Sequence, residues 1–106
     1  MQEEIIFERE GSTLRVTLLC ELDHHHARHL RERVDHRLFL EKPEVLLLDF
    51  SHVPFMDSSG VAFILGRAKC ARALGALVSL TGLSRELTRL TGLWGAEAYS
   101  NITIRK

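Results

Sequence analysis

The sequence predicts an α/β fold, in which a single domain has a mixed sheet of four to five strands packed with about three helices. Its 106 residues suit one hydrophobic core, and 45% of them are apolar. Segments with strand-like and helix-like apolar periods alternate along the chain, which is typical of an α/β domain. No stretch rich in proline, glycine and serine divides residues 1–106, so we expect one domain over the whole chain.

The first two segments, 5–9 and 13–19, are predicted to form an antiparallel pair of strands. In the second, apolar residues at positions 14, 16 and 18 alternate with polar ones, which gives the strand one apolar face. Gly11 and Ser12 between the segments are typical of a hairpin turn.

A helix is predicted from Asp23 to about residue 40, because the apolar residues change to a helical spacing. Asp23 precedes this pattern and is a suitable N-cap, and Lys42-Pro43 ends the helix. The apolar stripe consists of Ala27, Leu30, Val34 and Leu38.

The second half of the chain alternates strands and helices. The continuous apolar run 45–50 predicts a central strand covered on both faces. A second helix is expected over 58–73, ending at Gly75, and a buried strand over 76–80. Ser84 is a suitable N-cap for a third helix, which Gly92 closes, and 98–104 predicts a short last strand.

Charge and composition exclude several classes of function. Fourteen basic residues balance fourteen acidic ones, so we expect binding neither to nucleic acid nor to an anionic membrane. The apolar runs are shorter than a membrane span, and the N-terminus is acidic where a signal peptide would be basic. Cys20 and Cys70 form no CxxC pattern and are expected to be free thiols of a cytoplasmic protein.

The turn Asp57-Ser58-Ser59-Gly60 is the strongest candidate site, since it joins a buried strand to a helix N-terminus. Three interpretations are open: a helix cap, a phosphorylated serine, or a hydrolase nucleophile. The GxSxG pattern of hydrolases is absent, which disfavours the third. The glycine would allow another molecule to approach the helix end closely.

Three kinds of side chain near this turn are candidates for binding or catalysis: a carboxylate, an aromatic ring and a basic set. Asp23 ends a strand, and its carboxylate is expected beside the Asp57-Ser58 turn, where the two carboxylates could hold the serine hydroxyl. Phe63 lies off the apolar stripe of its helix and is expected to be an exposed aromatic residue of a partner interface. A basic set is expected on the solvated face of the same helix: Arg67, Lys69 and Arg72.

The histidine run His24-His25-His26 raises the question of a metal. Adjacent helical residues point about 100° apart, so the three rings cannot share one ion. His25 and His29 are spaced to share a face, but a third ligand is not evident, and HExxH is absent. We therefore predict no metal ligand and no cofactor, with polar residues in the first turn of a helix as the simpler interpretation. His29, His36 and His52 are expected at the surface.

Three motifs together resemble the STAS domain of anti-sigma factor antagonists, including sporulation proteins. They are 21–25 (Glu-Leu-Asp-His-His), 55–61 (Phe-Met-Asp-Ser-Ser-Gly-Val) and 64–67 (Ile-Leu-Gly-Arg). The resemblance covers about residues 5–93. It implies that Ser58 is phosphorylated by an anti-sigma factor that is also a serine kinase. A serine phosphatase of the PP2C type would reverse this.

In such proteins the unphosphorylated form binds the anti-sigma factor and so frees the sigma factor, without catalysis of its own. Asp23 matches the acidic residue beside the phosphorylated serine. The residues expected to bind the partner are Asp23, His24, Asp57, Ser58, Ser59, Gly60 and Phe63. We expect a monomer in the free state.

The sequence departs from the family pattern in three places. Cys20 stands where a glycine is usual, and His26 extends a histidine pair to three. We expect the C-terminal helix usual in the family to be missing or altered. Two other functions remain open besides that of an anti-sigma factor antagonist. One is a STAS module of another partner-switching or stress-sensing pathway, and the other is a small serine hydrolase or metal-binding protein.

Overall fold

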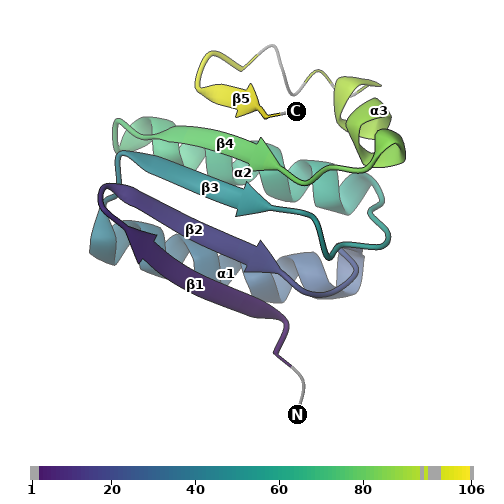
Figure 1. Cartoon of the computed structure of the whole chain (residues 1–106), viewed down its shortest axis with the longest axis horizontal. Coiled ribbons are helices and arrows are strands. Elements are labelled where there is room, and N and C mark those ends of the chain that lie inside the picture. Colours follow the sequence, from purple (N-terminus) through teal and green to yellow (C-terminus); the bar gives the residue numbers. More distant parts are fainter. Residues whose placement is uncertain (1–2, 94, 96–98, 106) are drawn as a thin grey trace.

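The computed structural model describes residues 3–93, 95 and 99–105, and it has an α/β fold with two layers. A five-stranded sheet forms one layer, and helices α1 and α2 lie side by side behind it (Figure 1). The strands are β1 (Ile5–Glu10), β2 (Thr13–Leu18), β3 (Val45–Asp49), β4 (Leu77–Thr81) and β5 (Ile102–Ile104). The helices are α1 (His24–Glu41), α2 (Ser58–Ala73) and α3 (Arg85–Leu93).

The sheet is mixed, as predicted. Its order follows the sequence, β1-β2-β3-β4-β5; β1 and β2 are antiparallel, and the other neighbours are parallel. The hairpin between β1 and β2 turns at Gly11, whose φ of +58° is favourable for glycine. Of the predicted last strand, 102–104 pairs with β4, and residue 98 lies outside the described residues.

The core lies between the sheet and the two helices behind it. The buried residues of α1 are the predicted stripe Ala27, Leu30, Val34 and Leu38. They face the buried residues of β2, β3 and β4, among them Leu14, Val16, Leu46, Leu48, Val78 and Leu80. Helix α3 continues through Gly92, which was predicted to close it, to Leu93. The other helix ends agree with the sequence. Lys42 adopts the left-handed conformation after α1, Gly75 has a φ of +76° after α2, and the Ser84 hydroxyl accepts a bond from Leu87 N–H.

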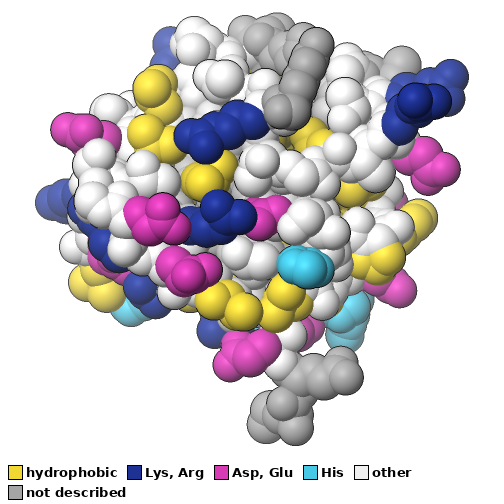
Figure 2. Space-filling view, viewed as in Figure 1, with side chains coloured by type: hydrophobic (Ala, Val, Ile, Leu, Met, Phe, Trp, Pro, Cys, Tyr) yellow, Lys and Arg dark blue, Asp and Glu magenta, His cyan; other side chains and the backbone are white. Residues whose placement is uncertain are grey.

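The prediction that the central strand is covered on both faces is wrong. Helices α1 and α2 both lie on one face, and within the described residues no helix covers the other (Figure 1). Figure 2 views this uncovered face and shows charged side chains of both signs among hydrophobic ones. Leu47 and Asp49 of β3 point to it and are nevertheless only 5% exposed. Paired residues of β2 and β4 project their side chains to the same face and flank them.

Asp49 and Arg15 form an ion pair on this uncovered face, with 2.6 Å between Nη2 and Oδ2. Burial would by itself raise the pKa of Asp49. However, hydrogen bonds from Ser51 N–H and from Arg15 outweigh burial and hold the pKa below its ordinary value of 3.8. Asp49 therefore stabilises the fold above its unfolded-state pKa, and this contribution is lost as the pH falls through its lower folded-state pKa.

We expect Asp49→Asn to destabilise the protein at neutral pH by about 2 kcal/mol, and to flatten the loss of stability below about pH 4. Urea unfolding at several pH values measures both effects. Glu8→Gln is the control, because Glu8 is an exposed carboxylate opposite Arg15 in the β1–β2 register. An Asp49→Asn protein whose acid unfolding matches that of the unaltered chain would contradict this account.

Both cysteines, Cys20 and Cys70, are free thiols, as expected. In the described part of the chain, the helices are too short or too polar to cross a lipid bilayer.

Candidate functional site

A short backbone pairing brings the N-termini of α1 and α2 together. Leu22 and Met56 form a parallel bridge, and the Leu22 N–H donates to the Phe55 carbonyl over 2.9 Å. Asp23 and Asp57 follow these paired residues directly, at the edge of the sheet where its parallel strands end. Asp23 was predicted to lie beside the serine turn, and the backbone pairing of Leu22 with the Phe55–Met56 segment brings the two together.

Both aspartates are N-caps. The Asp23 carboxylate accepts the His26 N–H over 2.9 Å, and the Asp57 carboxylate accepts the Ser59 N–H over 2.8 Å. Each cap contributes about 1 kcal/mol to its helix. The backbone bond from His26, followed by one from the His26 ring, lowers the pKa of Asp23, so Asp23 carries a negative charge at neutral pH. The prediction that these two carboxylates hold the Ser58 hydroxyl is therefore wrong. They accept backbone N–H groups instead.

The two serines differ in accessibility. Ser58 is the first residue of α2 and is exposed, whereas Ser59 is half-buried. The helix N-terminus beneath them carries a partial positive charge and unpaired N–H groups. Ser58 is therefore the hydroxyl that an external enzyme can reach, and a phosphate there would lie at a favourable end of the helix dipole.

Gly60 is buried, and its role differs from the one predicted. A Cβ atom built on it would lie 2.0 Å from Met56 Cγ and 2.7 Å from the Leu22 carbonyl oxygen. The missing side chain therefore lets α2 pack closely on the Leu22–Met56 bridge. It opens no approach for an external molecule.

A groove of about 410 Å³ runs between the first turns of α1 and α2. It brings together three of the predicted partner-binding residues: His24, Ser59 and Phe63. The other lining residues are Ala27, Arg28, Arg31 and Ala62.

Phe63 and Arg67 are buried, which corrects two predictions. Phe63 is 3% exposed, and the Arg67 guanidinium lies over its ring, with Cζ 5.2 Å from the ring centroid. Arg67 is itself 4% exposed and pairs with Asp35 of α1, with 2.6 Å between Nε and Oδ1. Helix α2 packs against both the sheet and α1, so its buried face is wider than one stripe. Lys69 and Arg72 are exposed as predicted.

The exposed aromatic residue near the serine turn is Phe55, which sequence reasoning missed. Phe55 is 52% exposed, and its carbonyl oxygen accepts the hydrogen bond from the Leu22 N–H. A large apolar side chain exposed beside Ser58 is typical of a protein interface. The available signal was its position in a turn, outside any helix or strand pattern.

No described imidazole is placed to act as the base of a hydrolase nucleophile at Ser58 or Ser59. Among the described side chains, the imidazole that makes a hydrogen bond is His26, with Asp23, and none is bonded to Ser58 or Ser59. His29, His36 and His52 are exposed as predicted.

Comparison with known proteins decides the family. Residues 4–103 match the STAS domain family. The chain belongs to that family.

Similar members of the STAS family are regulators of anti-sigma factors. An anti-sigma F factor antagonist from Paenibacillus polymyxa is 32% identical over 90% of this chain and 81% of its own. The solved structure of SpoIIAA, an anti-sigma factor antagonist, in its unphosphorylated form has a TM-score of 0.74 and 23% identity, and the match covers 96% of this chain and 87% of the other. The phosphorylated form of the Bacillus cell fate determinant SpoIIAA gives 0.72 and 24%, with 96% and 91% coverage. These similarities confirm the predicted STAS fold.

Proposed function

We propose that this STAS domain is an anti-anti-sigma factor that is switched by phosphorylation of Ser58. The unmodified form binds an anti-sigma factor that is also a serine kinase, and so frees the sigma factor. The observation that carries the proposal is the exposed Ser58 hydroxyl at the start of α2, beside the paired caps Asp23 and Asp57. The similarity to the Paenibacillus antagonist supports the same role.

The proposed interface surrounds this serine. Its accessible residues are Asp23, His24, Asp57, Ser58 and Ser59, with the exposed Phe55 at its margin. The buried Gly60 and Phe63 support these residues from beneath. His24, Ser59 and Phe63 line the groove, and Asp23 and Asp57 fix the two helix starts. Gly60 contributes by allowing α2 to begin against Leu22.

Phosphorylation would act through local charge. A phosphate adds about −1.5 to −2 charges next to the ionised Asp23, while the helix dipole of α2 tolerates it within the free protein. A partner that buries Ser58 as a neutral hydroxyl would have to desolvate this charge and face its repulsion by nearby carboxylates. Complex formation is therefore lost without any refolding of the domain.

The remaining parts of the proposal follow from this role. A PP2C-type phosphatase restores the unmodified form, and the chain acts as a substrate and a ligand without catalysis or a cofactor of its own. It works as a monomer in the cytoplasm, with residues 1–106 as one domain and with neither nucleic acid nor membrane as a partner.

Incubation with ATP and the anti-sigma kinase of the host, followed by peptide mapping by mass spectrometry, tests the proposal. We expect one phosphate on Ser58. Ser59→Ala should accept it, and Ser58→Ala should not. A kinase that phosphorylates a known substrate but leaves this chain unmodified would contradict the proposal and favour a STAS module of another pathway. Phosphate on Ser59 alone would contradict the assignment of the residue.

A further inference from the structure

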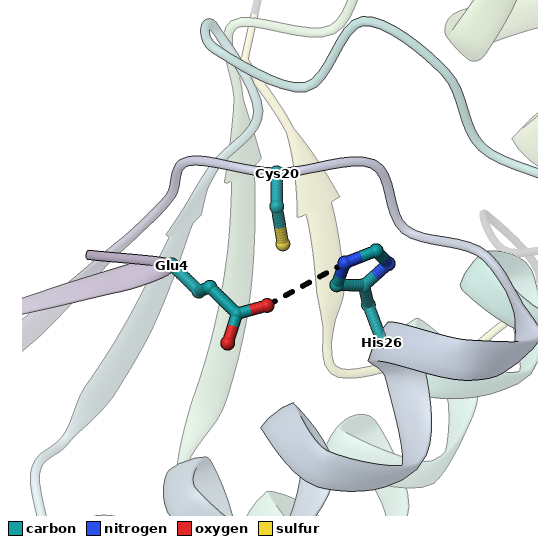
Figure 3. Close-up of side chains that lie close together, drawn as sticks. All are labelled: Glu4, Cys20 and His26. Atoms are coloured by element: carbon teal, nitrogen blue, oxygen red, sulfur yellow. Dashed lines mark ion pairs between the residues drawn. The ribbon is translucent and has the colours of Figure 1, made fainter. Parts of the chain in front are cut away.

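The side chains of Glu4, Cys20 and His26 converge beside the first turn of α1 (Figure 3). They come from three segments: the residue before β1, the loop after β2, and α1. One ligand atom from each lies within 4.8 Å of the other two. Two of these residues, Cys20 and His26, are among the departures from the family pattern noted in the sequence.

We propose that Glu4, Cys20 and His26 form a binding site for a divalent metal ion of the zinc class. Thiolate, imidazole and carboxylate are the three ligand types that zinc prefers in proteins. In a tetrahedral zinc site, the ligand atoms lie roughly 3.3–3.6 Å apart. The Nε2 atom of His26 and a carboxylate oxygen of Glu4 are already 3.5 Å apart, so closure requires a shift of the thiol side of the cluster by about an ångström.

The second observation is the hydrogen bond on the other side of the His26 ring. Its Nδ1 atom lies 2.8 Å from Asp23 Oδ1, while its Nε2 atom faces Glu4. A carboxylate that accepts the Nδ1 proton leaves Nε2 with a lone pair for a metal, and this arrangement accompanies most histidine ligands in proteins. Asp23 therefore orients the ring in addition to capping α1.

His29 is the candidate for a fourth ligand. His29 lies one helical turn after His26, and its Nε2 atom is 3.7 Å from the other carboxylate oxygen of Glu4. His29 is exposed, so its ring is free to turn toward the ion. The site is open on this side, where Glu4, His25, His26 and His29 line a hollow of about 340 Å³.

The electrostatic environment favours a cation. The carboxylates of Glu4, Asp23 and Glu21 surround the Cys20 thiol and make the local potential negative. Negative charge that disfavours a lone thiolate attracts a metal ion, which then displaces the thiol proton. An alternative role for Cys20 as a reactive nucleophile would require the opposite environment.

In the experiment, Zn²⁺ is titrated into the purified chain in competition with a chromogenic chelator. Co²⁺ is titrated separately as a spectroscopic probe, and both titrations contain a reductant that is not a thiol. We expect one equivalent of metal and a thiolate-to-cobalt charge-transfer band. Cys20→Ser should abolish the band and weaken Zn²⁺ binding by at least about 100-fold, and Asp23→Asn should weaken it by about 10–100-fold.

Two matched variants serve as controls. Cys70→Ser removes the other thiol, and His36→Ala removes an exposed imidazole of α1 that lies outside the hollow. Both should bind as the unaltered chain does. Glu4→Gln provides a second test of the site if Cys20→Ser fails to fold, and it should also weaken binding. Absence of stoichiometric binding, or binding that survives Cys20→Ser unchanged, would overturn the proposal.

Discussion

Ser58→Asp is expected to weaken binding to the anti-sigma factor by roughly a thousandfold, which corresponds to about 4 kcal/mol. The introduced carboxylate adds a charge beside Asp23 at a position that the complex would bury, so its cost includes both desolvation and repulsion. Ser58→Ala should retain binding, because the interface accepts a small neutral group there. Isothermal titration calorimetry with the purified anti-sigma factor measures the affinities.

Ser84→Asp is the matched control for charge and helix position. Ser84 caps α3 through its hydroxyl and is exposed, so the variant places the same carboxylate at another helix N-terminus. Asp is as good an N-cap as Ser, and both stability and binding should be preserved.

Phe55→Ala should weaken binding without unfolding the domain, since its aromatic ring is exposed beside the site. If Ser58→Asp and Ser58→Ala bind equally well, the proposed switch is wrong.

Gly60→Ala is expected to lower the free energy of unfolding by about 2–3 kcal/mol. The added Cβ atom would meet the Leu22 carbonyl oxygen at 2.7 Å, and this oxygen belongs to the backbone that pairs with the Phe55–Met56 segment. Relief of the clash requires α2 to move away from the bridge. Denaturant unfolding followed by circular dichroism measures the loss.

Gly66→Ala tests whether the effect comes from this close approach. Gly66 lies in the same helix, and a Cβ atom built there meets nothing within 4 Å. Alanine favours a helix over glycine, so we expect Gly66→Ala to stabilise the protein by about 0.5–1 kcal/mol. Gly60→Ala with unchanged stability would show that α2 does not depend on the bridge.

Local sequence signals predicted most of the fold and the two helix starts that surround the site. The stripe from Ala27 to Leu38 placed α1 on the core, and Asp23 and Asp57 were suitable caps in the positions where the structure has them. Such features depend on spacing within one element, which the sequence records directly.

Features that depend on packing between distant segments could not be predicted in this way. Phe63 and Arg67 are buried because α1 lies against α2, and the partner of Arg67 is 32 positions away in the sequence, at Asp35. The apolar run of β3 indicated cover on both faces, whereas its neighbours in the sheet bury Leu47 without a helix. Glu4, Cys20 and His26 belong to no local motif, so the sequence suggested only the pair His25 and His29, of which His29 is the proposed fourth ligand.

The central claim is that one phosphate on Ser58 controls binding to the anti-sigma factor. The most direct test prepares the protein phosphorylated on Ser58 alone and compares its affinity with that of the unmodified protein, before and after treatment with a PP2C-type phosphatase. We expect tight binding by the unmodified form, a loss of roughly a thousandfold on phosphorylation, and full recovery after dephosphorylation. Equal affinities of the two forms for the anti-sigma factor, or no binding by either, would contradict it.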